Sequence, residues 1–318
     1  MSTPGISTRH AFSAALLGAA RKDKRIYAIC SDSKGSVTLG DFEKALPAQF
    51  VEAGIAEQDA VGIGAGLAKS GKRVFVCGPA SFYSARSLEQ VKVDVAYAAS
   101  DVKVIGISGG LSYGALGSTH HSLHDLAVMR TFPGLSVFLP CDNYQTAALT
   151  RYLAENPGPA YLRLGRSPVE DVYAEGCGQA FAPGAAVTLC EGSDCAIIAA
   201  GETVQGALGA AFLLEKEGIK ARVLDFWSIK PIDREAVIKA AHETGMIVTV
   251  EEHSIYGGLG SAVAEIVVQE CPVPMRIVGV PDEWALSGSP KELFDYYGFT
   301  SVKLAATIKA GLETKGKR

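Results

Sequence analysis

Short apolar runs alternate with amphipathic segments along almost the whole chain. In the first half, the apolar runs predict strands at residues 25–30, 50–52, 73–77, 102–107, 136–139 and 160–163. The amphipathic segments between them predict helices at 9–22, 57–69, 84–99 and 143–155. Strands that are apolar at nearly every position are typical of a parallel sheet with helices on both faces, so this half predicts an α/β domain.

The alternation breaks between residues 167 and 184, where two prolines and three glycines occur, and then resumes. The second half predicts strands at 195–200, 221–226, 246–251 and 275–278, and helices at 203–217, 234–242, 257–269, 291–297 and 302–312. We therefore predict two α/β domains, each a mainly parallel sheet flanked by helices, at 1–168 and 186–318. A linker at 169–185 joins them.

The composition narrows the class of protein. The chain has 318 residues, of which 48% are hydrophobic and 20% charged, with a net charge of -4. These values are typical of a soluble globular protein, and the only basic run is the tail at 315–318. No apolar run reaches membrane-spanning length, and the N-terminus lacks a signal-peptide core. We expect neither a nucleic acid nor a membrane as partner.

Cysteine usage points to a reducing compartment. The seven cysteines are an odd number and include no C-x-x-C pair: Cys30, Cys77, Cys141, Cys177, Cys190, Cys195 and Cys271. Several of them lie within apolar runs, as buried reduced thiols do. The pattern therefore predicts a cytoplasmic protein without a zinc site.

Glu57 is the first candidate for chemistry. It begins the predicted helix at 57–69, whose body is apolar and contains Gly62, Gly64 and Gly66. A carboxylate is stabilised at the positive end of a helix, and a helix with little side-chain bulk can lie close against another backbone. We expect Glu57 at the edge of a buried contact. From the pattern alone, a helix-start carboxylate without chemistry is the alternative.

Other side chains could hold a flat ring or an anion. Phe82 and Tyr83 follow the strand at 73–77, where they could stack on a ligand or pack in the core. Arg9 begins the first predicted helix and Arg166 follows the strand at 160–163, so either guanidinium could bind phosphate or be solvated. Ligands of parallel sheets bind at the carboxyl ends of strands, which makes these positions candidates.

The glycine-rich segment 107–125 is a third candidate. It follows the strand predicted at 102–107 and contains His120, His121 and His124, three of the six histidines in the chain. Long glycine-rich loops in compact domains are usually functional. With Asp125 the histidines could bind a metal, but no zinc motif is complete, so a neutral imidazole that contacts substrate is the preferred interpretation.

Taken in order, these segments resemble the transketolase family, specifically its C-terminal half. The matching segments are Gly54-Ile-Ala-Glu-Gln58, Ser81-Phe-Tyr83, Gly117-Ser-Thr-His120, Pro140-Cys-Asp142, Leu162-Arg-Leu-Gly-Arg166, Val248-Thr-Val-Glu-Glu-His253 and Gly257-Gly-Leu-Gly260. The resemblance covers essentially the whole chain and corresponds to the pyrimidine-binding domain plus the C-terminal domain. No Gly-Asp-Gly followed by a magnesium-binding Asn occurs, so the diphosphate-binding domain is expected on another chain.

The resemblance implies a function for the whole assembly. It implies transfer of a two-carbon ketol unit from a ketose phosphate to an aldose or its phosphate, in carbohydrate metabolism, with thiamin diphosphate and Mg²⁺ as cofactors. This chain would be one subunit of a split transketolase, active only with an N-terminal subunit that supplies the diphosphate and metal site. The expected assembly is an α2β2 heterotetramer, and no metal ligand is expected in this chain.

The resemblance also implies roles for individual residues. Glu57 would be catalytic by sharing a proton with N1′ of the coenzyme's aminopyrimidine, and His120 by contacting substrate hydroxyls. The coenzyme would be bound by Glu57, Phe82, Tyr83 and Arg86, with either Phe82 or Tyr83 stacked on the pyrimidine. The sugar phosphate would be bound by Arg9, Ser36 and Arg166.

One departure from the family pattern affects the substrate, and other assignments stay open. Leu116 stands where the family often has an Asp that contacts the donor, which implies an uncommon sugar. The chain could instead be the β subunit of a thiamin-dependent 2-oxo acid dehydrogenase, a part of a 1-deoxyxylulose-phosphate synthase type of enzyme, or a non-catalytic regulatory subunit. In the second domain, the acidic run that ends at His253 could be a cation or substrate site, but packing between domains or subunits is preferred.

Overall fold

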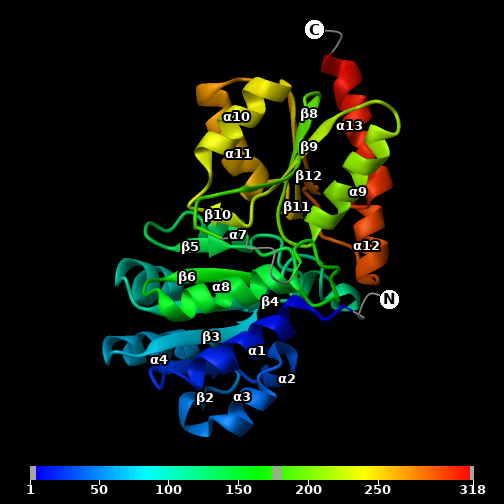
Figure 1. Ribbon diagram of the computed structural model, residues 1–318. Coiled ribbons are helices and arrows are strands. Elements are labelled where there is room, and N and C mark those ends of the chain that lie inside the picture. The colour runs from blue at the N-terminus through cyan, green and yellow to red at the C-terminus, as the bar shows by residue number, and fades with distance from the viewer. Residues whose placement is uncertain (1–4, 175–178, 180, 316–318) are drawn as a thin grey trace.

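The computed structural model describes residues 5–174, 179 and 181–315. These residues form two lobes, with the N-terminal half below and the C-terminal half above in Figure 1. Part of the predicted linker, Cys177 and the end of the basic tail lie outside the described residues.

The first lobe is built on a seven-stranded sheet in the order β10-β5-β6-β4-β3-β1-β2. Six strands come from the first half of the chain: β1 (Ile26–Cys30), β2 (Phe50–Glu52), β3 (Arg73–Pro79), β4 (Val102–Ile107), β5 (Ser136–Phe138) and β6 (Ala160–Leu164). All of them pair in parallel. The predicted parallel sheet is therefore confirmed, and all six strands lie where the apolar runs placed them.

Helices cover both faces of this sheet. On one face, α1 (Thr8–Ala20) and α8 (Asn143–Glu155) pack together and bury the side chains Phe12, Leu16, Leu149 and Leu153. On the other face lie α4 (Glu57–Lys69) and η2 (Val91–Tyr97). The shorter helices are α2 (Lys34–Val37), α3 (Gly40–Ala45), η1 (Pro47–Gln49), η3 (Gly114–Thr119) and α7 (Asp125–Met129).

The helix predicted at 84–99 is wrong as a single element. The structure has α5 (Ala80–Ala85), α6 (Leu88–Gln90) and then η2, which is a π-helix. The hydroxyls of Ser84 and Ser87 donate to the carbonyls of Ala80 and Tyr83, four residues back, at 2.7 and 3.1 Å. Serine bonds of this kind bend helices, which accounts for the interruption.

The second lobe contains a five-stranded sheet in the order β12-β11-β8-β9-β7. Its strands are β7 (Val187–Cys190), β8 (Cys195–Ala199), β9 (Ala221–Asp225), β11 (Ile247–Ser254) and β12 (Met275–Val280). The helices α9 (Thr203–Glu215) and α13 (Ser301–Lys315) pack together, as do α10 (Arg234–Thr244) and α11 (Leu259–Glu270), and α12 (Pro290–Tyr296) precedes α13. Of these five strands only the edge strand β7 is antiparallel, and its half-exposed residues gave no clear apolar run.

The second half of the chain also contributes a strand to the first sheet. β10 (Ser228–Lys230) pairs antiparallel with β5. Beside it the fully buried Trp227 packs on Phe138, with ring centroids 5.7 Å apart, and the Trp227 carbonyl accepts from the Leu139 N–H at 2.7 Å. No separate apolar run at residues 228–230 was predicted as a strand, and periodicity does not report which sheet a strand joins, so this crossing was not predicted.

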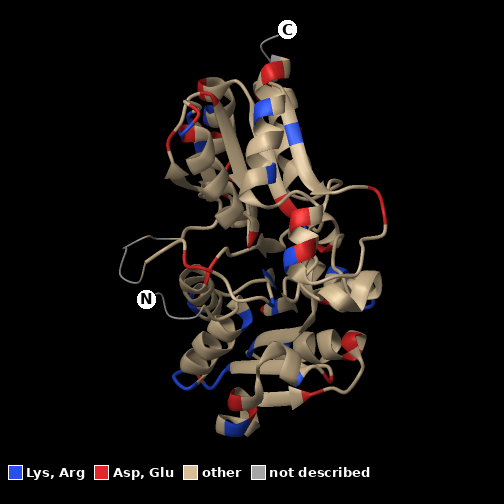
Figure 2. Ribbon diagram, turned by 90° about the vertical axis from the view of Figure 1, so that its right-hand side faces the viewer, with Lys and Arg blue, Asp and Glu red and all other residues tan. Residues whose placement is uncertain are grey.

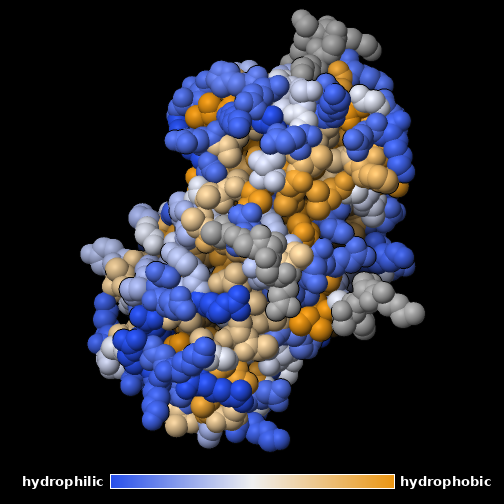
Figure 3. Space-filling model, in the orientation of Figure 1, coloured by the Kyte–Doolittle hydropathy of each residue, from blue (hydrophilic) through white to orange (hydrophobic). Residues whose placement is uncertain are grey.

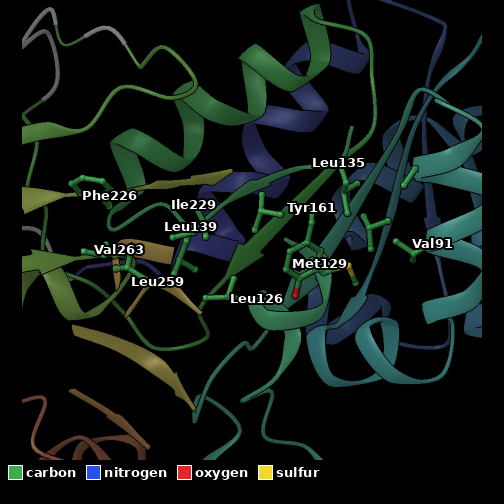
Figure 4. Packing of buried hydrophobic residues seen from close by; sticks show 14 of the residues in the cluster. Val91, Leu126, Met129, Leu135, Leu139, Tyr161, Phe226, Ile229, Leu259 and Val263 are labelled. Carbon is green, nitrogen blue, oxygen red and sulfur yellow. The ribbon is translucent and has the colours of Figure 1, made fainter. Parts of the chain in front are cut away.

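A hydrophobic cluster formed by buried residues spans both lobes. Figure 4 shows Leu126, Met129 and Tyr161 of the first lobe in the same cluster as Phe226 and Leu259 of the second. Burial of such side chains stabilises each by about 1.5–3 kcal/mol relative to exposure. The contact between the lobes is therefore part of the fold itself.

The described start of the linker is also packed. The Tyr173 hydroxyl donates to Oδ2 of Asp225 in the second lobe at 2.7 Å. The backbone N–H groups of Val172 and Tyr173 donate to Oδ2 of Asp142 in the first lobe, at 2.9 and 2.7 Å. This segment thus ties the two lobes together on its way between them.

Charges of both signs are spread over both lobes, as Figure 2 shows. On the side of α9, α12 and α13, Figure 3 shows hydrophobic side chains at the surface of the second lobe. The exposed large hydrophobic residues include Phe212 of α9 and Val302 of α13. None of the helices formed by the described residues is long and apolar enough to cross a membrane. The six described cysteines are free thiols, four buried and two half-buried, as predicted for reduced cysteines.

Candidate active site

Glu57 is the first residue of α4, and its side chain is buried. After β2 the chain turns at Gly54, whose φ of +72° favours glycine, and then enters the helix. Only 5% of Glu57 is exposed, and its Oε1 accepts a hydrogen bond of 2.9 Å from Nη1 of Arg86. The carboxyl group therefore lies out of bulk solvent at the positive end of a helix, as expected from the sequence, and beside Arg86, which the resemblance assigned to the same coenzyme site.

Arg86 connects Glu57 to a row of rings. Its Cζ atom lies 3.9 Å from the centroid of the Phe82 ring, within the range of a cation–π contact. The Phe82 ring meets His120 edge-on with centroids 5.4 Å apart, and His120 meets Tyr113 at 5.2 Å. Phe82, His120 and Tyr113 are each only half-buried. The row is therefore open to a ligand along part of its length.

Tyr83 does not belong to this row. Its ring is fully buried against β3, where it leaves no room for a Cβ atom at Gly78. Its hydroxyl donates to Oγ of Ser31 at 3.1 Å, and burial raises the pKa of the phenol. We therefore correct the expectation that Tyr83 contacts the coenzyme: it is a core residue, and of the two adjacent rings Phe82 is the accessible one.

Arg9 and Arg166 lie at the other end of the row. Cζ of Arg166 is 5.3 Å from the Tyr113 ring centroid, and its Nη1 is buried without a hydrogen-bond partner among the described residues. Nη1 of Arg9 donates to the backbone carbonyl of Ser36 at 2.8 Å, so Ser36 does not use its hydroxyl for this contact. Burial, followed by the like charge of Arg166, lowers the pKa of Arg9. Two neighbouring guanidinium groups with an unused donor suit an anion such as phosphate.

Tyr113 joins the two ends of the site and was not among the predicted residues. It lies in the glycine-rich loop, which we define as residues 108–122 and which is closed by a bridge between Gly110 and Ser122. Burial raises the pKa of the Tyr113 phenol, and the positive charges of Arg166 and Arg9 oppose that shift. The sequence did carry a signal, because Tyr113 is the one aromatic residue of the segment 107–125 apart from its histidines.

The other candidate residues of the segment 107–125 lie outside the row of rings. His121 is buried, its Nε2 lies 3.2 Å from the Gly114 carbonyl oxygen, and burial lowers its pKa. Nε2 of His124 lies 3.3 Å from Oγ of Ser84. Leu116 is 56% exposed. Among the described residues, no group of three or more His, Cys, Asp or Glu side chains is placed to hold a metal ion.

Two family models cover nearly the whole chain. The transketolase pyrimidine-binding domain matches residues 4–171, and the transketolase C-terminal domain matches residues 184–304. This agrees with the two α/β lobes. The chain belongs to the transketolase family.

The names of individual relatives are more specific than the two family models. The chain is 59% identical over 302 residues to an apulose-4-phosphate transketolase subunit of Phocaeicola vulgatus, with 95% of this chain and 96% of that protein covered. It is 38% identical over 303 residues to a 6-deoxy-6-sulfo-D-fructose transketolase subunit of a Clostridium species, with 95% and 94% covered. A solved structure of an inactive β4 tetramer of a split gene transketolase matches with a TM-score of 0.88 and 40% identity over 98% of this chain and 99% of that one. The chain is therefore a transketolase-type transferase subunit.

Proposed function

We propose that this chain is one subunit of a split, thiamin diphosphate-dependent transketolase. The observation that carries the proposal is the continuous row that runs from Glu57 through Phe82 and His120 to Arg166. A carboxyl group and an accessible ring stand at one end, and a pair of arginines stands at the other. Ketol transfer between sugar phosphates needs a coenzyme ring and a phosphate held on either side of the reacting carbons, and the row offers a place for each.

The residues present fit the pyrimidine end of thiamin diphosphate. When bound, the coenzyme supplies the electron sink for ketol transfer. Glu57 shares a proton with N1′ of the ring, for which we assign Oε2, because Oε1 is bonded to Arg86. Phe82 stacks on the ring, and His120 hydrogen-bonds substrate hydroxyls.

The phosphate end sets the class of substrate. Arg9 and Arg166 bind the phosphate of a ketose phosphate, and the Ser36 segment holds Arg9 in place through its carbonyl. The name of the relative from Phocaeicola vulgatus makes apulose 4-phosphate the first sugar to test. Leu116, which is exposed on the same loop as His120, is compatible with a donor that differs from the common ones.

The diphosphate-binding domain and Mg²⁺ are assigned to a partner subunit, in an α2β2 assembly. The similar split-gene β4 tetramer is inactive, which supports the need for a partner. We also propose domain limits at 1–168 and 186–318 and a cytoplasmic location. The free thiols of the six described cysteines support that location.

The open face of α4 is the surface that we assign to this partner. A Cβ atom at Gly62 or Gly66 would meet nothing within 4 Å. Gly62 also lines an open cavity of about 440 Å³, together with Gln58, Asp59, Ile63 and Gln90. Ile55, just before α4, and Tyr97, at the end of η2, are 76% and 88% exposed. A face without bulk beside exposed apolar side chains fits close approach of another chain.

Gly62→Arg is expected to block assembly without unfolding the chain. Nothing occupies the space at Gly62, and replacing a glycine inside a helix favours the helix by up to about 1 kcal/mol. Size-exclusion chromatography of the two co-expressed chains and thermal unfolding of this chain measure both effects. Gly18→Arg in α1, where the space is equally open, is the control and should assemble normally. Normal assembly of Gly62→Arg would show that this face is not the interface.

The proposed function is tested on the purified complex of this chain with the chain that carries the diphosphate-binding domain. We expect turnover of a ketose phosphate, apulose 4-phosphate first, that requires both chains, thiamin diphosphate and Mg²⁺. Decarboxylation of 2-oxo acids with an artificial electron acceptor would instead favour the dehydrogenase β subunit. Stimulation of a complete transketolase, without turnover of its own, would identify a regulatory subunit.

A further inference from the structure

Two adjacent acidic residues near the end of β11 make contacts in different domains. Glu251 and Glu252 are adjacent on a strand and point to opposite faces of the sheet. The carboxylate of Glu251 stays within the second domain, where it accepts from the N–H groups of Leu259 and Gly260 at 2.7 and 2.8 Å at the start of α11. Glu252 instead reaches into the first domain.

Glu252 contacts the base of the glycine-rich loop. Its Oε1 accepts a hydrogen bond of 2.5 Å from the N–H of Leu111. Nη2 of Arg163, on β6, donates to the backbone carbonyl of Glu252 at 2.6 Å and lies 3.8 Å from its Oε2. At Gly110 the side chains of Arg163 and Glu252 leave no room for a Cβ atom. The base of the loop is thus packed against side chains from both domains.

The tip of the loop also rests on the second domain. Oγ of Ser118 donates to the Ala285 carbonyl at 2.8 Å, and a Cβ atom at Gly114 would lie 2.7 Å from the Gly288 carbonyl oxygen. Tyr113 lies between these two attachments, and His120 lies between Ser118 at the tip and Ser122, which is bridged to Gly110 at the base. Both members of the active-site row that come from the loop are therefore held by contacts to the C-terminal domain.

We propose that Glu252 is a positioning residue of the active site, because it fixes the base of the glycine-rich loop so that Tyr113 and His120 stay in line between Phe82 and Arg166. Its expected effect on turnover rests on the proposed function, whereas its effect on the loop does not. Glu252 lies behind the loop and acts through it, which distinguishes it from the residues of the row itself.

The surroundings of Glu252 suggest which substitution should preserve the loop. Burial, followed by the neighbouring charge of Glu202, raises the pKa of Glu252 to about 8, and Arg163 and Asp125 are the other charged groups that act on it. The bond from Leu111 needs only a lone pair on oxygen, which a neutral carboxyl group or an amide offers as well as a carboxylate. Glutamine has such an oxygen at the same chain length, whereas methionine has similar length and no oxygen.

Hydrogen exchange of this chain alone tests the effect on the loop. In Glu252→Met, peptides that cover residues 109–122 should exchange at least about ten-fold faster than in the wild type, and Glu252→Gln should stay near wild type. Glu251→Gln is the matched control and should speed exchange only at the start of α11. The proposal is overturned if Glu252→Met leaves the loop unchanged, or loosens it no more than Glu251→Gln does.

Two further measurements keep the test decisive. If Glu252→Met does not fold, Ser118→Ala, at the half-buried tip, should speed exchange in the same peptides, and unchanged exchange there overturns the attachment to the second domain.

In the assembled enzyme, Glu252→Met should raise the KM for the ketose phosphate roughly ten-fold, with a smaller change in kcat and in coenzyme affinity, and Glu252→Gln should restore it. An unchanged KM in Glu252→Met overturns the positioning role. A wild-type complex without any turnover counts against the proposed function, and the exchange result then decides alone.

Discussion

Glu57→Gln is expected to lower the kcat of the assembled enzyme by about 10³-fold, within the range found for loss of an acid–base group. An amide can keep a hydrogen bond to Arg86 but cannot give or take the proton that the coenzyme ring requires. Because Glu57 is almost the same size as glutamine and only 5% exposed, packing around α4 should survive. The measurements are kcat of the complex and the melting temperature of the isolated chain.

The control for this change is Glu235→Gln. Glu235 also lies in the first turn of a helix, α10, but it is exposed and belongs to the second domain. The substitution Glu235→Gln should change neither kcat nor assembly. A Glu57→Gln enzyme with wild-type kcat and normal coenzyme binding would remove the proposed role of Glu57, and the assignment of this end of the row to the coenzyme would fall with it.

Arg166→Gln is expected to raise the KM for a ketose phosphate by roughly 10- to 100-fold, as the loss of a hydrogen bond to a charged group implies. The guanidinium has a buried Nη1 without a partner among the described residues, so its removal leaves a bound phosphate with one donor fewer. The value of kcat should change less, because the reacting carbons lie away from the phosphate. Steady-state kinetics with the phosphorylated sugar gives both numbers.

The same sugar without its phosphate is the internal control for Arg166→Gln. Its kcat/KM should be low in the wild type and nearly unaffected by the substitution. Arg21→Gln, at the exposed end of α1, controls for the loss of one positive charge. An equal loss of kcat/KM for both sugars would mean that Arg166 supports the site in another way, through its contact with Tyr113.

Much of the fold could be predicted because most strands are apolar and buried. The six strands of the first half, from β1 to β6, needed only the period of the hydrophobic residues. β10 and β7 were not found in this way, since β10 pairs with a strand of the other lobe and β7 is half-exposed. The interruption of the predicted helix at 84–99 depends on hydrogen bonds of serine side chains, which apolar periodicity does not report.

Residue types and their order in the sequence predicted most side chains of the candidate site, but not how these side chains are arranged. Phe82 and Tyr83 could not be separated from the sequence because neighbours on a helix point about 100° apart and either can face the core. The contact between Glu252 and Leu111 joins residues 141 positions apart, in different domains. Such a contact becomes visible only when both sheets are in place. The ion pair of Arg86 with Glu57 lies within the first lobe, but its residues are 29 positions apart and their pairing likewise depends on tertiary structure.

The strand β10 has a consequence for any attempt to divide this chain. A fragment ending near residue 185 would lack β10, and β5 would become a bare edge with unsatisfied amide and carbonyl groups. Bare edges recruit other copies, so such a fragment would be prone to aggregate even though its own sheet is otherwise complete. The natural unit of melting and refolding is therefore the pair of lobes together.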